Sequence, residues 1–235
     1  MLLWIIVQKP EKASIYRRQI IVELDHLGLE SLGIVAIISV FMGAVVTIQT
    51  AFNTDHPLLP IYAIGFATRQ SIILEFSPTV ISLILAGKVG SRIASEIGTM
   101  RVTEQIDALE IMGVNAAGYL ILPKIVASMI INPFLVVASM FLGIFGGWLA
   151  AAVTGVVPLG NFVYGILFEF DPFDVFYALI KTVVFALIIA SVSGYFGFYT
   201  RGGALQVGHS STRAVVFSSI YIIIFNLILT QLLLV

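Results

Sequence analysis

Two charged residues, Glu75 and Lys181, occur within long apolar stretches of the sequence. A charged side chain inside a membrane-spanning segment is costly, so such a residue indicates a functional site that acts through its charge. Two other interpretations stay open. The two residues can form a structural ion pair, or the Lys181 side chain can extend along its helix to the membrane interface.

A second candidate site is the polar stretch 86–113, which lies between two apolar ones. Thr103 can cap a helix that runs to about Met112, and Gly113 can end it. One face of this helix is apolar and another acidic: Val102, Ile106, Leu109 and Met112 form the first, and Glu104, Asp107 and Glu110 the second. Helices at the anionic inner membrane surface usually have a basic polar face. The acidic face therefore favours a basic groove on a partner protein, and the alternative is a solvated helix without a partner.

Other chemistries have no matching pattern in the sequence. There is no cysteine and no Gly-x4-Gly-Lys-Ser/Thr phosphate loop, which excludes a thiol nucleophile and a nucleotide site of that type. The histidines fall in three separate segments, so we expect no metal site: His26, His56 and His209. Three amides in or beside apolar stretches are expected to make hydrogen bonds between helices: Asn132, Asn226 and Gln231.

The composition indicates that lipid is the solvent of this chain. Hydrophobic residues make up 59% of its 235 residues and charged residues only 11%, whereas a soluble domain carries about 25% charged residues. The formal net charge of −1 argues against nucleic acid as a partner.

Five apolar stretches approach the ~20 residues needed to cross a bilayer: residues 32–52, 69–89, 119–153, 173–199 and 214–234. The third is too long for one straight crossing, so it tilts, kinks near Pro133 or breaks into a helix pair. Residues 1–30 combine apolar and charged side chains at helical spacing, which predicts a helix in the interface plane. The alternative for this segment is a solvated leader.

Individual residue types also predict where helices begin and which helix faces pack together. Capping residues predict where the last two spans begin: Asp171, Pro172 and Asp174 for the fourth, and Ser210, Ser211 and Thr212 for the fifth. Small residues at every fourth position let helices approach closely, within a bundle or a dimer. They are Ser139, Gly143, Gly147 and Ala151 in the third span, and Ala186, Ala190 and Gly194 in the fourth.

Basic residues predict the orientation, because they gather on the cytoplasmic side. With a cytoplasmic N-terminus and a periplasmic C-terminus, only Arg69 and Lys181 fall towards the outer side. The others lie on or near the inner side: Lys9, Lys12, Arg17, Arg18, Lys88, Arg92, Arg101, Lys124, Arg201 and Arg213. No basic region precedes the apolar Met1–Val7, so we expect no cleaved signal peptide. We also expect no transit peptide, which favours the bacterial inner membrane.

The stretch from Glu96 through Leu109, which reads EIGTMRVTEQIDAL, and the following Met112-Gly113-Val114 closely resemble the signature of the MlaE/YrbE permease family. This family includes chloroplast permeases of plants. The likeness covers most of residues 28–235 and includes Ser31, Gly43, Gln49, Pro123 and the stretch 202–219.

The resemblance implies a permease of an ABC transporter that moves phospholipids or related lipids between membranes. Its fold would be all-α and integral to the membrane. A single domain over 1–235 would hold an interfacial helix at 1–30, a five-span bundle at 32–235 and a cytoplasmic coupling segment at 92–114. The implied partners are a second permease copy, an ATPase that carries ATP and Mg²⁺, and an MCE-type substrate-binding protein on the outer side. We expect no cofactor and no enzymatic activity in this chain itself. The residues assigned to ATPase coupling are Glu96, Arg101, Thr103, Glu104, Asp107 and Glu110.

One departure from the family pattern concerns the lipid path. Many relatives have Arg-Glu-Leu-Gly-Pro where this chain has the sequence from Leu74 to Pro78, so Leu74 replaces a basic residue. Arg69 is a candidate substitute. The stretch around Lys181 matches one that keeps this lysine in relatives. We expect Glu75, Lys181 and Arg69 to line an outward-facing lipid cavity, with Lys181 meeting the phosphate.

Two other classes of protein fit the sequence less well. A secondary transporter driven by an ion gradient is expected to have inverted repeats, broken helices and several buried acids. The sequence has no convincing internal repeat and few acids within its apolar stretches. An intramembrane enzyme would need a Ser–His pair, a His/Glu metal set or a His-x4-Asp box, and none occurs.

Overall fold

The chain is described by a computed structural model that covers residues 13–54 and 60–234. Within these ranges the regular structure is entirely helical. Five stretches are long and apolar enough to cross a membrane: Tyr16–Asn53, Ala63–Val102, Ala116–Thr154, Pro172–Phe198 and Ala204–Leu234. Four of the predicted spans fall within one stretch each, and the span predicted over 173–199 extends one residue past Phe198. The prediction of an all-α integral membrane protein is confirmed.

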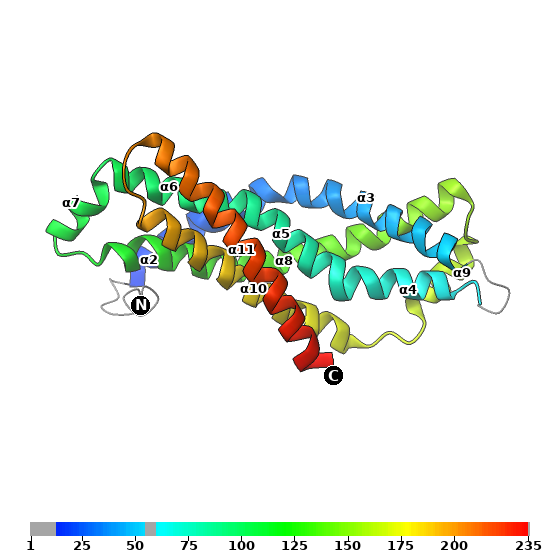
Figure 1. Cartoon of the computed structure of the whole chain (residues 1–235). Helices are drawn as coiled ribbons and strands as arrows, with labels where there is room; N and C mark the ends of the chain where they lie inside the picture. The colour runs from blue at the N-terminus through cyan, green and yellow to red at the C-terminus, as the bar shows by residue number, and fades with distance from the viewer. Residues whose placement is uncertain (1–12, 55–59, 235) are drawn as a thin grey trace. The chain divides into compact units, whose positions relative to one another are not determined.

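The first two stretches are helices interrupted by wider π-helical turns, and Figure 1 labels their α-helical parts α2, α3, α4, α5 and α6. The first comprises α2 (Ala13–Leu24), η1 (Asp25–Leu29) and α3 (Glu30–Asn53), and the second comprises α4 (Ala63–Ser71), η2 (Ile72–Val80), α5 (Ile81–Leu85), η3 (Ala86–Gly90) and α6 (Ser91–Val102). Pro78 lies inside η2, where its missing N–H fits an altered hydrogen-bond ladder. The predicted interfacial helix is described only from Ala13 onward, and its place in the interface stays a prediction.

The remaining helices are α7 (Gln105–Ile111), α8 (Ala116–Thr154), α9 (Leu159–Leu167), α10 (Pro172–Phe198) and α11 (Ala204–Leu234). The third span is therefore one helix of 39 residues that continues through Pro133. The start of α10 is as predicted, because the Phe173 N–H donates to Asp171 Oδ1 at 2.9 Å. The predicted start of the fifth span is wrong. Its capping candidates lie inside α11, where the Thr212 hydroxyl donates back to the Gly208 carbonyl and the Ser211 hydroxyl donates to that of Ser91.

The chain forms two compact units, each built from separate segments. Unit 1 takes the residues up to Ser31, Ser82–Asn132 and the residues from Val183 onward, and unit 2 takes Leu32–Ile81 and Pro133–Thr182.

Unit 2 depends on close contacts between helix backbones. A Cβ atom on Gly43 of α3 would lie 1.8 Å from the Gly143 carbonyl oxygen of α8, and one on Gly146 would lie 2.0 Å from the Val40 carbonyl oxygen. A side chain at these positions would separate the two helices. The predicted small-residue ridge of the third span is thus confirmed as a packing face. A second close contact joins α4 to α9, where Gly65 and Gly165 meet (Figure 1).

Unit 1 packs α6 against the beginning of α11 and against α10. Ala186 and Ala190 are fully buried, and a Cβ atom on Gly194 would lie 2.8 Å from Ile121 of α8. The ridge predicted in the fourth span is therefore also a packing face. By contrast, α11 buries only Ala214, Ser218 and Ile222, and from Val216 onward most of its exposed side chains are apolar, with Leu227 69% exposed and Leu232 74% exposed.

Candidate functional site

Glu75 of η2 and Lys181 of α10 form an ion pair inside unit 2. The Lys181 ammonium lies 2.9 Å from Glu75 Oε1 and donates to the Tyr177 hydroxyl at 3.0 Å and to the Leu74 carbonyl at 3.3 Å. The Lys181 side chain has no exposed surface, whereas 44% of the Glu75 side chain is exposed. Lys181 therefore does not extend to the interface. A lipid phosphate would reach its ammonium only after the Glu75 side chain had moved.

Tyr177 is not among the site residues predicted from the sequence, although it lies one helical turn before Lys181. Besides its hydrogen bond, its ring lies 4.7 Å from the Lys181 ammonium, close enough for a cation–π interaction. The spacing of four residues is the signal that would have paired these two side chains.

Arg69 belongs to a different part of unit 2. Its guanidinium is buried and donates to the carbonyls of Ile166 at 2.7 Å, Phe168 at 2.8 Å and Glu169 at 3.3 Å. These carbonyls lie in the last turn of α9 and just past it, where the negative end of the helix dipole favours a cation. Arg69 therefore clamps the end of α9 onto α4. Its hydrogen bonds go to the end of α9 and not to the Glu75–Lys181 pair, and its contact with lipid stays a prediction.

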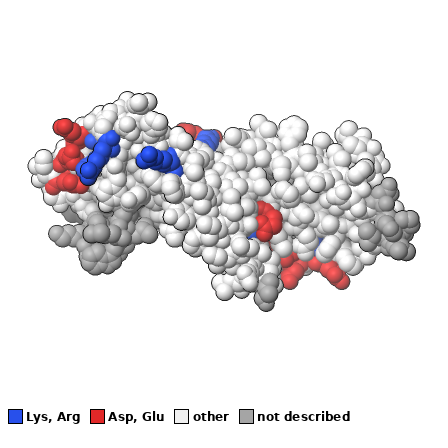
Figure 2. Space-filling model, viewed as in Figure 1, with Lys and Arg blue, Asp and Glu red and all other residues white. Residues whose placement is uncertain are grey.

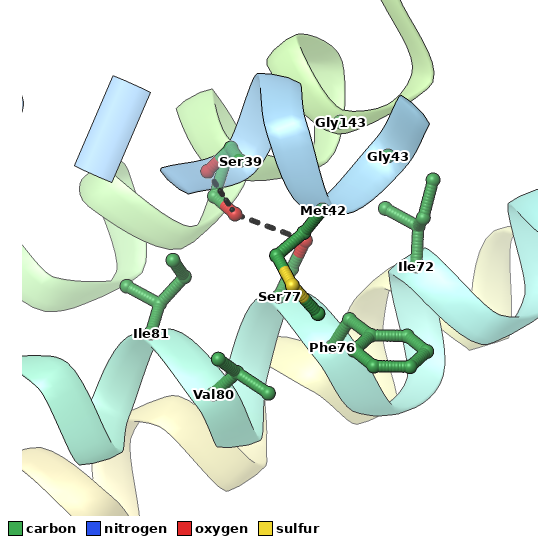
Figure 3. Close-up of a pocket in the computed structure, with 10 residues that line it drawn as sticks. Ser39, Met42, Gly43, Ile72, Phe76, Ser77, Val80, Ile81 and Gly143 are labelled. Carbon is green, nitrogen blue, oxygen red and sulfur yellow. Dashed lines mark hydrogen bonds between the residues drawn. The ribbon is translucent and has the colours of Figure 1, made fainter. Parts of the chain in front are cut away.

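A small cavity among α3, η2 and α8 is the next polar feature of unit 2 (Figure 3). Its volume is about 10 Å³, which suits one water molecule at most. The hydroxyl oxygens of Ser39 and Ser139 lie 2.9 Å apart, and those of Ser139 and Ser77 lie 3.1 Å apart. The cavity is too small for a lipid, and its serines bond mainly to one another.

The predicted docking helix is present as α7, but its start differs from the prediction. Thr103 ends α6 instead of capping α7, and its hydroxyl donates to the Thr99 carbonyl at 2.9 Å. Glu104 precedes α7 in a left-handed conformation with φ of 60°. The chain turns sharply there, which separates α7 from α6. Gly113, with φ of 79°, lies just past the end of α7 as predicted.

One side of α7 contacts the rest of unit 1, and the other side is exposed. Ile106 is fully buried, and Asp107 bonds the Arg101 guanidinium at 2.6 Å. Arg101 also lies over the Phe198 ring of α10, 5.7 Å from its centre. Glu104, Glu110, Ile111 and Met112 are exposed, and Figure 2 shows acidic side chains gathered over the end that carries α7. Arg101 and Asp107 therefore hold α7 in place, and the exposed residues can meet a partner.

Glu96 has a partner inside unit 1. Lys124 of α8 is buried, and its ammonium lies 2.9 Å from Glu96 Oε2 and 2.5 Å from Glu23 Oε1. This triad joins α2, α6 and α8. From the sequence Lys124 contributes only to the predicted orientation, because no spacing shows that three distant residues meet.

The remaining candidates do not cluster. In residues 13–54 and 60–234 no three metal-binding side chains come together, and His56 lies outside the described residues. Asn132 is fully buried, and neither side-chain atom has a hydrogen-bond partner among the described residues, so its predicted interhelical bond is not seen in this chain.

Five apolar helical stretches, charged groups paired within the bundle and a projecting amphipathic helix define a multi-pass α-helical membrane protein. The sequence pattern of the family described as Permease MlaE matches residues 20–232. The chain belongs to the MlaE permease family.

Similar proteins extend over nearly the whole chain. A "Probable ABC transporter permease protein" of Rickettsia bellii is 36% identical, with 94% of this chain and 85% of that protein aligned. A Synechocystis protein, "Probable ABC transporter permease protein slr1045", is also 36% identical over 94% of this chain and 84% of its own length. The Arabidopsis thaliana "Protein TRIGALACTOSYLDIACYLGLYCEROL 1, chloroplastic" is 32% identical over 94% of this chain and 63% of its own length.

Proposed function

We propose that this chain is the permease subunit of an ABC transporter that moves phospholipids or related lipids between membranes. The observation that carries the proposal is α7, a short helix anchored by Ile106 and Arg101 that leaves acidic and apolar side chains exposed. An ATPase with a basic groove fits both kinds of contact. The names of the Rickettsia and Synechocystis relatives support this partner.

The division of labour follows from the energetics of a two-state transporter. The ATPase binds ATP and Mg²⁺, and its closure changes the environment of α7. Because α7 is fixed to α6 through Arg101, its displacement biases the conformations of the permease. No cofactor is needed in this chain.

The lipid contact is assigned to the Glu75–Lys181 pair. A buried lysine held by one partly exposed carboxylate and one tyrosine hydroxyl can exchange the carboxylate for a phosphate without leaving its charge unpaired. The Tyr177 hydroxyl can then donate to the phosphate as well. The Arabidopsis relative carries the name of a galactolipid, which supports a lipid substrate.

The proposed setting is the bacterial inner membrane, with a cytoplasmic N-terminus and a periplasmic C-terminus. The proposed assembly has two copies of this chain, two ATPase subunits and an MCE-domain protein on the outer side. The apolar surface of α11, which this chain leaves exposed, is available to lipid or to the second copy.

Affinity purification in mild detergent tests the proposal. The variant should carry Glu104→Arg and Glu110→Arg, because Asp107 is already paired with Arg101. Asp25→Arg, an exposed acid on η1, is the matched control. We expect an ATPase to co-purify with the wild type and the control but not with the double variant, and phospholipid to remain bound in all three. Absence of an ATPase from all preparations would refute the proposal that α7 docks an ATPase. An ion-driven transporter would then be the next hypothesis to test.

A further inference from the structure

Unit 1 contains a cavity of about 620 Å³ among α2, α6 and α8. Its volume is within the range of small-molecule sites, roughly 300–1,000 Å³. The lining residues are Arg18, Gln19, Val22, Glu23, Glu96, Met100, Tyr119, Leu120, Pro123 and Lys124. None of them belongs to the Glu75–Lys181 site, and transport as proposed above assigns no role to the cavity.

One wall of this cavity carries balanced charge. Lys124 is buried between Glu23 and Glu96, and Arg18 lies on the rim. Glu23 contacts Lys124 through Oε1 and Glu96 through Oε2, and a carboxylate can accept several more hydrogen bonds. The Gln19 Oε1 atom is buried and has no hydrogen-bond partner among the described residues. The polar wall thus offers acceptors for an N–H donor beside a guanidinium that suits a phosphate.

The rest of the lining is largely apolar and includes Val22, Met100, Tyr119 and Leu120. A ligand that fills the cavity therefore needs an apolar portion beside a headgroup with both charges. An anionic headgroup would meet two carboxylates, and a purely cationic one would meet Arg18 and Lys124. A primary ammonium suits the acceptors better than a quaternary one, because the latter has no N–H to donate.

We propose that this cavity binds a zwitterionic aminophospholipid, with the ammonium at Glu23, Glu96 and Gln19 and the phosphate at Arg18. The site rests on the proposed function only for its placement in the inner leaflet. Met100 lines the cavity and precedes Arg101, the residue that anchors α7. Occupation of the cavity therefore alters the support of the docking helix.

Native mass spectrometry of the delipidated full-length chain in detergent tests the site. The probes are phosphatidylethanolamine, phosphatidylcholine, phosphatidylglycerol and glycerophosphoethanolamine, which is the headgroup without acyl chains. We expect phosphatidylethanolamine to bind about tenfold more tightly than the other three, as the loss of one charge-assisted hydrogen bond would give. Equal binding of phosphatidylglycerol, or of the chain-free headgroup, would overturn the proposal.

Two pairs of neighbouring variants localise the binding. Val22→Trp fills the cavity from its rim, and Ile21→Trp is its control, since Ile21 is exposed and does not line the cavity. Arg18→Glu removes the phosphate partner, and Arg17→Glu on the neighbouring exposed position is its control.

We expect each cavity variant to lower the affinity about tenfold, while its control leaves it unchanged. If the cavity variants bind like their controls, the site is wrong, whatever the transport assay gives. If binding falls as expected but lipid transport does not occur, the proposed function fails and the site stands.

Discussion

Substitution of Arg69 distinguishes two roles for this residue: holding the end of α9 in place and contacting lipid. The change Arg69→Ala removes two short hydrogen bonds, at 2.7 and 2.8 Å, and one longer bond at 3.3 Å, all to carbonyls near the end of α9. Arg69 is 1% exposed, so water does not readily replace the guanidinium. Hydrogen bonds to charged groups contribute about 1.5–3 kcal/mol each. We expect the two short bonds to account for a loss of about 3–6 kcal/mol in the free energy of unfolding.

Thermal unfolding in detergent measures this loss. For a chain of 235 residues, a loss of that size lowers Tm by on the order of 10 °C. Arg213→Ala removes an exposed arginine and serves as the control, with an expected change within about 0.5 kcal/mol.

The variant Arg69→Lys decides between the two roles. A lysine keeps the charge but not the planar fork that reaches several carbonyls at once. If Arg69 is a clamp, Arg69→Lys will lose most of the stability that Arg69→Ala loses. Wild-type Tm in Arg69→Lys, or equal Tm values for Arg69→Ala and Arg213→Ala, would refute the reasoning.

Three further predictions follow from packing and charge. Gly43→Ala should destabilise the protein by at least about 1–3 kcal/mol in detergent unfolding, because its Cβ meets a backbone carbonyl. Gly33→Ala on the same helix has open space and should be neutral or stabilising by up to about 1 kcal/mol, so equal effects would contradict the packing argument. Lys181→Met should cost more stability in the wild type than in a protein that already carries Glu75→Gln, with a coupling energy of about 1–3 kcal/mol in a double-mutant cycle. Additive effects of the two substitutions would mean that the ion pair contributes nothing. Arg101→Ala should raise amide hydrogen exchange in residues 105–111 about fivefold, since a part-exposed ion pair is worth about 1 kcal/mol, and unchanged exchange would show that Ile106 alone holds α7.

Long apolar stretches were enough to predict the five spans, because hydrocarbon thickness sets their minimum length. Their ends were less predictable. Ser211 and Thr212 look like capping residues in the sequence, but in α11 their hydroxyls bond carbonyls, a use that hydroxyls also have inside helices. Thr103 was assigned to the wrong helix for the same reason: its hydroxyl bonds backward to Thr99.

The part of the candidate site that could be predicted is its pair of charged residues within apolar stretches. Glu75 and Lys181 stood out because charged residues seldom occur inside spans, and the structure brings them together. The clamp made by Arg69 could not be read from the sequence, since it depends on where α9 ends. The Lys124 triad joins residues that are 101 and 28 positions apart, and no local pattern encodes that meeting.

The division of the segments between the two units limits how this protein can be altered by recombination. The chain passes from one unit to the other four times, after Ser31, Ile81, Asn132 and Thr182. A single crossover between homologous genes would therefore mix the parentage of at least one unit and pair helix faces that had not been selected together. Only an exchange with crossovers at all four positions would transfer unit 2 whole, with Gly43 and Gly143 from the same parent, and also leave unit 1 unmixed.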